Sequence, residues 1–406
     1  RGDCVEKRIE KVESFWNGDT FDPESNVQFG EGGAGTFSDG KLNTGTNDPR
    51  IAWVLSEFHR FGAHESITYD AKPHIGTDVL VNVVRNIRKH IISLGGEIHF
   101  RHRFCDYSAA DGVITVSAEH EGAVLQFVSE YVILALGHSS RDTFELLYRK
   151  GLELQQKPFS IGVRIEHPQS LINIAQYGKI KGLPPADYKL NCRTKSGSAY
   201  TFCMCPGGSV VAAASEPNSI VTNGMSDRAR DKENANSALL VSVTPEDFPN
   251  NHPLAGMYWQ REIEQRAFAY SGSYRAPAQL VGDFLNGHAS AGKSSVNPSY
   301  RPSVFFGDIR EVLPKKITDT IAEALPILGR KLKGFDDPDA VMTAPETRSS
   351  SPVRIVRGTD RTCINGLYPC GEGAGYAGGI TSAAVDGMKT AEAVIQHILS
   401  KNGEKI

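Results

Sequence analysis

The chain has 406 residues, a formal net charge of −3 and a predicted isoelectric point near 6.5. This balance argues against a nucleic-acid-binding protein, which ordinarily shows a basic excess, and it gives no attraction to an anionic membrane surface. With 40% hydrophobic residues the chain has enough apolar side chains for a large core, and its length predicts two domains rather than one.

Targeting and redox signals predict an intracellular protein, located in the cytoplasm or in the stroma or matrix of an organelle. No apolar run approaches the roughly 20 residues that span a bilayer, and the charged segment 1–11 does not resemble a signal peptide. The seven cysteines are an odd number without the spacing of a disulfide framework. They therefore favour free thiols in a reducing compartment.

Alternating short elements are predicted in the first part of the chain. The glycine-dense loop 26–41 is followed by an amphipathic helix at 77–94, whose apolar residues recur at helical spacing. The other elements predicted there are strands at 97–104, 113–118, 124–128 and 131–136 and a helix at 143–149. The strand at 131–136 is continuously apolar, as a buried parallel strand is.

The pattern of predicted elements changes between about 158 and 352. Strand-like pieces at 159–166 and 210–214 alternate with prolines and long polar loops, and helices are predicted at 254–269 and 317–328. Pro326 is expected to kink or shorten the second helix.

A short strand at 367–370 and a helix at 380–399 return to the first pattern. This order predicts an α/β protein in which a Rossmann-like parallel sheet is interrupted by a mixed α+β substrate or cap domain. The predicted domains are 1–154 together with 356–406, and the insert 155–355.

Two stretches match G-x-G-x-x-G, which indicates a dinucleotide site only between a strand and a helix. The first, Gly30 to Gly35, has no helical pattern after it and does not fit. The second, Gly373 to Gly378, lies between a strand and a helix, but too few residues follow for a complete βαβ unit. Its helix N-terminus offers free backbone N–H groups to an anion or a carbonyl oxygen. The alternative is a turn that only packs the helix against the sheet.

The segment 367–391 resembles the C-terminal motif of two-domain flavoproteins that bind flavin adenine dinucleotide (FAD). In that family a strand ends in Gly-Asp or Gly-Glu, and a helix that starts with glycine follows. The resemblance implies that Glu372 contacts the ribityl or pyrophosphate side of FAD. It also implies that Gly379, Ile380 and Thr381 contact the isoalloxazine ring through their backbone.

Two further segments agree with this resemblance. The strand ending in Ala-Leu-Gly at 135–137 resembles the family strand that passes near FAD, although Leu136 replaces the usual threonine. The phrase QFGEGGAGTFSDGKL at 28–42 resembles the flavin-side loop of an uncharacterised FAD-dependent dehydrogenase family, and the segments 200–208 and 346–352 are similar to that family too. The residues expected to contact FAD are Gly33, Ala34, Gly35, Thr36, Ser38, Asp39, Lys41, Phe104, Leu136, Gly137, Glu372, Gly379, Ile380 and Thr381.

The same resemblance implies a missing part. In that family an N-terminal strand–GxGxxG–helix unit binds the pyrophosphate, and a second strand leads to Arg-Gly, whereas this sequence starts at Arg1-Gly2. We therefore expect the first βαβ unit to be absent from this chain and the sheet to expose apolar edges. We also expect the chain as given to bind FAD weakly or not at all.

The expected activity is FAD-dependent hydride transfer of the dehydrogenase type. The substrate would be a small molecule, with NAD(P)H as one candidate partner and no nucleic acid or membrane partner. A flavin monooxygenase or oxidase stays open as an alternative, and so does a non-catalytic interaction module derived from a flavoprotein. The sequence singles out no catalytic residue and no metal site, because no Cys/His set has ligand spacing.

Several other polar residues have two interpretations. Cys203 and Cys205 are two residues apart, so on a strand they face the same side and are either a redox pair or, as we favour, ordinary buried cysteines. Arg348 and Arg354 either bind an anionic substrate or pair with the acidic run 336–339.

The segment before the first amphipathic helix carries His64, Tyr69, His74 and Asp78. We interpret it as a capping loop with surface histidines, in preference to a segment in which His74 faces the flavin. His138 follows the Ala-Leu-Gly strand and is expected near the cofactor or at the domain junction.

Overall fold

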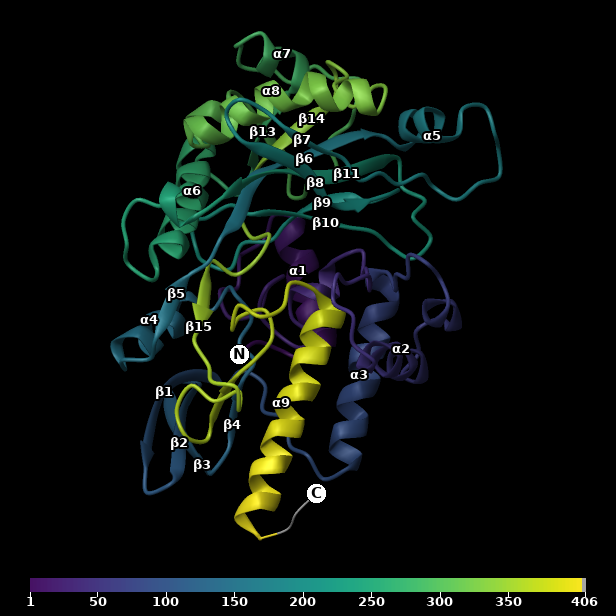
Figure 1. Ribbon diagram of the computed structural model, residues 1–406. Helices are drawn as coiled ribbons and strands as arrows, with labels where there is room; N and C mark the ends of the chain where they lie inside the picture. Colours follow the sequence, from purple (N-terminus) through teal and green to yellow (C-terminus); the bar gives the residue numbers. More distant parts are fainter. Residues whose placement is uncertain (404–406) are drawn as a thin grey trace.

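The computed structural model describes residues 1–403, and Figure 1 shows a large sheet with its helices above a lower part that contains both chain ends. Within these residues, no helix is both long and apolar enough to cross a membrane. The nine α-helices of this part of the chain are α1 (Val5–Trp16), α2 (Arg50–Arg60), α3 (Thr77–Ser93), α4 (Arg141–Arg149), α5 (Gln169–Tyr177), α6 (Ala255–Ser271), α7 (Val281–Leu285), α8 (Lys315–Lys331) and α9 (Ile380–Lys401).

The upper part is built on a seven-stranded mixed sheet (Figure 1). In spatial order its strands are β13 (Val304–Phe306), β12 (Ala276–Leu280), β14 (Val341–Glu346), β6 (Phe159–Pro168), β11 (Asn234–Val243), β8 (Ser198–Cys205) and β7 (Asn191–Arg193). The central pair, β6 and β11, is antiparallel over ten residues, from Phe159 opposite Val243 to Pro168 opposite Asn234. Its side chains are buried almost throughout, as expected for strands covered on both faces.

The smaller sheets lie mostly in the lower part (Figure 1). They are the antiparallel sheet of β1 (Arg103–Ala110), β2 (Val113–His120) and β3 (Ala123–Ser129), and the pairs β4 (Val132–Leu134) with β16 (Leu367–Pro369), β5 (Leu154–Gln156) with β15 (Val353–Ile355), and β9 (Ser209–Ala212) with β10 (Thr222–Met225). Only the pair β4–β16 joins the two parts of the predicted Rossmann-like domain by parallel pairing among the described residues. The α/β class is confirmed, and the Rossmann-like character of the sheet stays a prediction.

The predicted helices and the predicted hairpin at 113–128 are confirmed, but the prediction that Pro326 shortens its helix was wrong. α8 continues through Pro326 to Lys331. Leu325 and Leu328 on either side are fully buried. Their packing therefore outweighs the single backbone hydrogen bond that proline removes.

The predicted strand at 97–104 was also wrong, because the strand β1 begins only at Arg103. Arg101 just before it has a left-handed backbone with φ of 59°. Its guanidinium pairs with Asp3 at 2.5 Å and with Asp22 at 2.7 Å, and its N–H donates to the Gly2 carbonyl at 2.8 Å. These contacts tie this segment to the N-terminal region, so it cannot extend a ladder.

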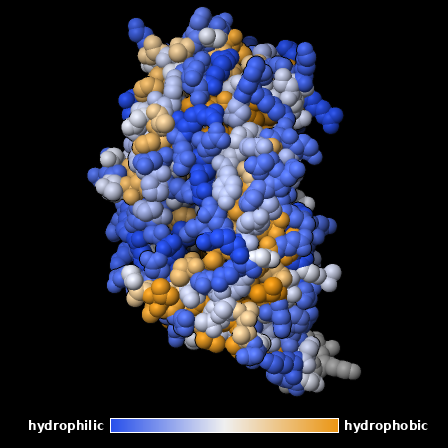
Figure 2. All heavy atoms as spheres, turned by 90° about the vertical axis from the view of Figure 1, so that its left-hand side faces the viewer, coloured by the Kyte–Doolittle hydropathy of each residue, from blue (hydrophilic) through white to orange (hydrophobic). Residues whose placement is uncertain are grey.

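The predicted strand at 131–136 is shorter and less buried than expected. β4 spans three residues, and the Ile133 side chain is 44% exposed, so the strand is covered on one face only. On the neighbouring β3, Val124 and Val128 are also exposed. Figure 2 shows the side of the molecule that is on the left in Figure 1. Hydrophobic side chains gather over the lower part of this side, at the height of the β1–β2–β3 sheet.

A buried ion network joins the two parts of the molecule. Glu264 of α6 is fully buried and accepts hydrogen bonds from Arg141, the first residue of α4, at 2.9 Å from each terminal nitrogen. Arg348, which follows β14, donates to the same carboxylate at 2.8 and 3.0 Å. Burial alone would raise the pKa of Glu264, but the two guanidinium groups outweigh it and hold this pKa at about 2.

The substitution Glu264→Gln is expected to destabilise the fold by about 3–5 kcal/mol, because it removes the shared counter-charge of two buried guanidinium groups. Urea unfolding measures this cost. The matched control is Glu262→Gln on the exposed side of the same helix, where the carboxylate pairs with Arg266 at 2.5 Å. That control is expected to cost less than about 1 kcal/mol. Equal losses in the two variants would show that the network does not hold the parts together.

The contribution of Glu264 to stability also predicts a pH dependence. Its pKa is about 2 in the folded protein, below the value of about 4.3 expected when unfolded. The contribution is therefore complete above about pH 4.3 and is lost as the pH falls towards about 2. We expect the difference in unfolding free energy between wild type and Glu264→Gln to be constant from about pH 7 to about pH 5 and to shrink below about pH 4. A difference unchanged down to about pH 3 would contradict this assignment.

Candidate functional site

The glycine-rich loop and the start of α9 meet, although more than 300 residues separate them in sequence (Figure 1). The Thr381 hydroxyl donates to the Leu42 carbonyl at 2.8 Å. A Cβ added to Gly35 would lie 3.1 Å from the Ile380 side chain, so the loop and the helix are in close contact there. Residues predicted from two separate motifs are thus brought together.

A second contact joins the end of β4 to the loop after β16. A Cβ added to Gly373 would lie 2.4 Å from the Gly137 carbonyl oxygen, so only glycine fits at this crossing. The adjacent His138 has its Nδ1 atom 3.1 Å from Oε1 of Glu372. Leu136, Gly137 and Glu372, predicted as neighbours of one cofactor, therefore lie together, and His138 lies beside them.

Unused hydrogen-bonding groups surround this second contact. Nε2 of His138 and Nε of Arg354 are buried without a partner. No side chain caps the N-terminus of α9, where Gly379 precedes the first turn. An added Cβ would meet nothing within 4 Å at Gly33, Gly137, Gly371, Gly378 and Gly379. An unpaired donor (Nε of Arg354) and an unpaired ring acceptor (Nε2 of His138) beside open backbone fit a bound polar group with hydroxyls and other oxygen atoms, as FAD has.

Asp39 and Lys41 connect the loop to the upper sheet. Asp39 is fully buried and pairs with Lys41 at 2.7 Å, with Arg230 and with the Ser226 hydroxyl. Burial raises the pKa of Asp39, but the charges of Lys41 and Arg230 lower it overall. The Lys41 ammonium also donates to the Met204 carbonyl in β8. These contacts fix the loop against the upper sheet.

His74 lies at the edge of this ion cluster. Its backbone forms an antiparallel bridge with Lys41, and its Nε2 atom is 3.4 Å from the Arg228 carbonyl oxygen. Burial, reinforced by nearby Arg230, lowers the pKa of His74. The imidazole is therefore neutral at physiological pH and next to the loop that the sequence assigned to the flavin.

The other predicted loop residues shape the loop itself. The Ser38 hydroxyl donates to the Gly35 carbonyl at 2.7 Å and accepts from the Gly40 N–H at 3.1 Å. Ala34 starts a short 3₁₀ helix that ends at Phe37. Thr36 in this helix is buried, and its hydroxyl has no partner.

Phe104 is placed differently from the loop residues. It lies in β1 with its ring stacked on Tyr107 at a centroid distance of 6.4 Å. Both belong to the apolar cluster that includes Leu134 and packs against Leu136. Phe104 thus reaches the candidate site only through this core.

In the segment before α3, His64, Tyr69 and Asp78 fit the capping interpretation, whereas His74 is partly buried beside Lys41 and is not a surface histidine. The His64 ring accepts from the Ser66 N–H at 3.2 Å, Tyr69 is 70% exposed, and Asp78 accepts from the Arg228 N–H at 2.9 Å.

Neither interpretation of Arg348 holds, because its side chain is almost fully buried and pairs with Glu264.

Sequence reasoning missed Glu264 and Arg141. A signal was present for the first, since Glu264 falls on the same helical face as Met257, Gln260 and Ala267, all of which are buried. A charged residue on an otherwise buried helix face predicts a buried ionic partner.

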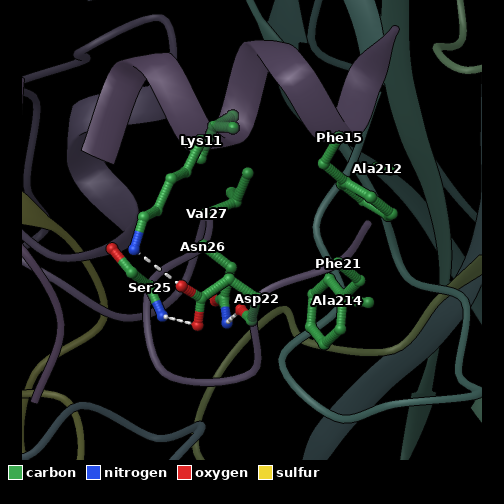
Figure 3. A pocket seen from close by; sticks show the side chains of 10 residues that line it. Lys11, Phe15, Phe21, Asp22, Ser25, Asn26, Val27, Ala212 and Ala214 are labelled. Carbon is green, nitrogen blue, oxygen red and sulfur yellow. Dashed lines mark hydrogen bonds and ion pairs between the residues drawn. The ribbon is translucent and has the colours of Figure 1, made fainter. Parts of the chain in front are cut away.

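Two hollows are separate from this site. A small cavity of about 10 Å³ lies between α1 and the loop at 21–27, with room for about one water. Figure 3 shows Lys11 and Asp22 on one side of it and Phe15 and Phe21 on the other. An open hollow of about 470 Å³ runs along β7 and β8. In residues 1–403, no group of three or more His, Cys, Asp or Glu side chains is arranged to hold a metal ion.

Comparison with known proteins identifies the family. The family described as FAD-dependent protein, C-terminal domain-like, matches residues 158–349. An uncharacterised protein of Clostridium beijerinckii is 49% identical over 407 residues, which cover 98% of this chain and 75% of that protein. The chain belongs to this family of FAD-dependent proteins. FAD, the cofactor predicted from the sequence, is confirmed as the cofactor of the family. The predicted domain boundaries stay a prediction.

Solved flavoproteins show only a distant likeness. CtdE in complex with FAD and substrate 4 is 9% identical with a TM-score of 0.33, over 82% of this chain and 58% of that one. A salicylate hydroxylase substrate complex is 12% identical with a TM-score of 0.36, over 82% and 60%. A flavoprotein/dehydrogenase from Cytophaga hutchinsonii is 9% identical with a TM-score of 0.33, over 80% and 55%. This chain spans less than two thirds of each, and such low scores assign no reaction.

The close contact at Gly373 gives a test of this geometry. Gly373→Ala is expected to cost about 1–3 kcal/mol, because the new methyl group meets the Gly137 backbone. Gly387→Ala in α9 is the matched control, since a Cβ there meets nothing within 4 Å. It is expected to stabilise the helix by about 0.5–1 kcal/mol. Both are measured by urea unfolding, and a neutral Gly373→Ala would refute the crossing.

Proposed function

We propose that the protein is an FAD-dependent oxidoreductase that transfers hydride, as a dehydrogenase does, between the flavin and a small-molecule substrate. The observation that carries the proposal is the contact of the glycine-rich loop with the N-terminus of α9, made by Thr381 and Leu42 at 2.8 Å. These are the two segments that resemble the flavin-side walls of FAD enzymes. FAD supplies the exchange of two electrons and a proton as hydride, and the protein supplies position and electrostatics.

The start of α9 is the first element with a role. The N–H groups of its uncapped first turn, from Ile380 onward, and the positive end of its dipole favour negative charge. If they face the pyrimidine of a bound flavin, they would favour negative charge there and so would favour its acceptance of hydride.

The second contact supplies one donor, one ring acceptor and one acid. Nε of Arg354 and Nε2 of His138 are buried without a protein partner. We assign Nε of Arg354 to an oxygen atom on the pyrophosphate side of FAD, and Nε2 of His138, whose Nδ1 donates to Glu372, to a ribityl hydroxyl as acceptor, with Glu372 as acceptor of another hydroxyl. Glu372 is held for this role by its 3.1 Å contact with His138.

The upper sheet bounds the substrate side in this proposal. Lys41 and Asp39 join the loop to β8 and to the segment that carries Ser226 and Arg230. Ligand pockets form preferentially at such junctions between domains. The substrate therefore binds where the loop meets this sheet, close to the neutral His74.

The assignment of Arg354 predicts a change in FAD affinity. Arg354→Met removes a buried donor and is expected to weaken FAD binding by about tenfold to a hundredfold. Titration of purified protein with FAD, followed by flavin fluorescence, measures it. Arg275→Met is the control, because Arg275 lies far off at the β13 edge, where it donates to the Val304 carbonyl at 2.9 Å. Equal affinities of the two variants would remove Arg354 from the site.

Oxygen reactivity separates the proposed reaction from its alternatives. The flavin-loaded protein is reduced without oxygen by NADH or NADPH and then mixed with oxygen or with an artificial electron acceptor. A dehydrogenase reoxidises slowly with oxygen and rapidly with the acceptor. Rapid reoxidation by oxygen would instead indicate an oxidase or a monooxygenase.

A further inference from the structure

We propose that Cys203 and Cys205 form a dithiol–disulfide exchange site that reacts with low-molecular-weight disulfides, with Cys203 as the attacking sulfur and Cys205 as the resolving sulfur. The pair lies at the end of β8, beside the glycine-rich loop. This inference does not depend on the proposed hydride transfer.

A β-bulge sets the direction of the two side chains. Along the pairing of β8 with β11, Phe202 is opposite Ala238 and Cys205 is opposite Asn236. The two residues between them on β8 therefore share a single partner position on β11. Cys203 in this bulge has a backbone φ of 44°, a left-handed conformation that residues other than glycine rarely adopt. Bulges re-aim side chains next to functional sites, and strained backbone is retained where it has a use.

The two cysteines are in contact but differ in exposure. The Cys205 thiol is 3.3 Å from the Cys203 carbonyl oxygen, to which it donates. Cys205 is fully buried, whereas Cys203 is partly exposed. An incoming disulfide therefore reaches Cys203, and Cys205 is in place to attack Cys203 afterwards.

Two cations face the pair from different elements. Lys41 from the loop donates to the carbonyl of Met204, the residue between the two cysteines. Arg164 from β6 donates to the Cys203 carbonyl at 2.9 Å. Positive charge beside a thiol favours the thiolate, which is the reactive form.

The carboxylates facing the pair are Asp39 and Glu346. Asp39 pairs with Lys41 at 2.7 Å, and Glu346 pairs with Arg164 at 2.5 Å. The interaction with the Cys205 side chain, together with the charges of Lys41 and Arg164, outweighs burial and holds the pKa of Cys203 well below its usual value. The same coupling and burial raise the pKa of Cys205. A reactive thiolate beside a protonated thiol is the arrangement that an exchange site needs.

The other cysteines lack this environment. Burial raises the pKa of Cys363 to about 11, and it also raises the pKa values of Cys192 and Cys370. The environment of Cys203 differs from that of these inert thiols because the ammonium group of Lys41 lies against the strand that carries Cys203.

The exchange balances in two steps. The Cys203 thiolate attacks one sulfur of the incoming disulfide, so a mixed disulfide forms, the original S–S bond breaks, and the released thiolate takes a proton from water. Cys205 then loses its proton to water and attacks the Cys203 sulfur, so the Cys203–Cys205 bond forms and the second small thiol leaves. The pair loses two electrons, and the small disulfide gains them.

The first experiment equilibrates the reduced full-length chain in glutathione buffers of increasing oxidised fraction and follows the thiols by peptide mass. We expect the peptide with Cys203 and Cys205 to lose two hydrogens, Cys205→Ser to accumulate glutathione on Cys203, and Cys203→Ser to accumulate none on Cys205. A wild-type peptide that stays fully reduced in every buffer would overturn the proposal. Protein with and without added FAD is expected to give the same result, so the outcome is independent of the flavin reaction.

The deciding measurement of the second experiment is made on the wild-type chain, so it does not depend on the folding of a variant. The alkylation rate of Cys203 by iodoacetamide is expected to be nearly flat from about pH 7 to about pH 9, whereas that of Cys363 rises about tenfold per pH unit. Lys41→Met is expected to restore a rise at Cys203. Lys72→Met, which removes an exposed lysine paired with Asp187 at 2.9 Å, is the control without effect. A tenfold rise per unit at Cys203 in wild type would overturn its role as the attacking thiolate.

Discussion

The buried carboxylate of Glu264 is the point on which the arrangement of the two parts depends. It pairs with Arg141 at the start of α4 and with Arg348 after β14, so it joins a helix of the lower part to two segments of the upper sheet domain. Arg141 also pairs with Glu216 at 2.5 Å, so two carboxylates compensate the two buried guanidinium groups. Arg348 also donates to Ser139 at 2.8 Å, next to the turn after β4. The position of that turn, and so of Gly137 and His138, therefore follows from one ion network.

A second ion cluster fixes the position of the glycine-rich loop, which forms the other part of the candidate site. Asp39 holds Lys41 and Arg230, and Lys41 reaches the bulged end of β8. The glycine-rich loop thus has little regular structure of its own and takes its shape from ion pairs and from the start of α9. A loop built in this way presents backbone on one face while its side chains anchor it from the other.

The sequence predicted the parts that depend on local pattern. The long helices followed from apolar periodicity, and the contact of the loop with α9 followed from motif resemblance in two distant segments. The strand at 97–104 failed because Arg101 is fixed by Asp3 and Asp22, carboxylates that no local pattern connects to it. The triad around Glu264 failed for the same reason, and the bulge at Cys203 depends on its pairing with β11. Ionic and ladder contacts between distant residues are set by the fold, so a single sequence does not show them.

The meeting of the loop with α9 has a consequence for how the protein is made. Leu42 and Thr381 are 339 residues apart, and Arg50 pairs with Glu392 across 342. At about 5–20 residues per second, the ribosome finishes α9 tens of seconds after the loop has emerged. Throughout that interval the glycine-rich segment lacks its partner helix. The contact between the loop and α9 therefore forms only after α9 has been made, and chains interrupted before α9 keep an unpaired loop that quality-control proteases can recognise.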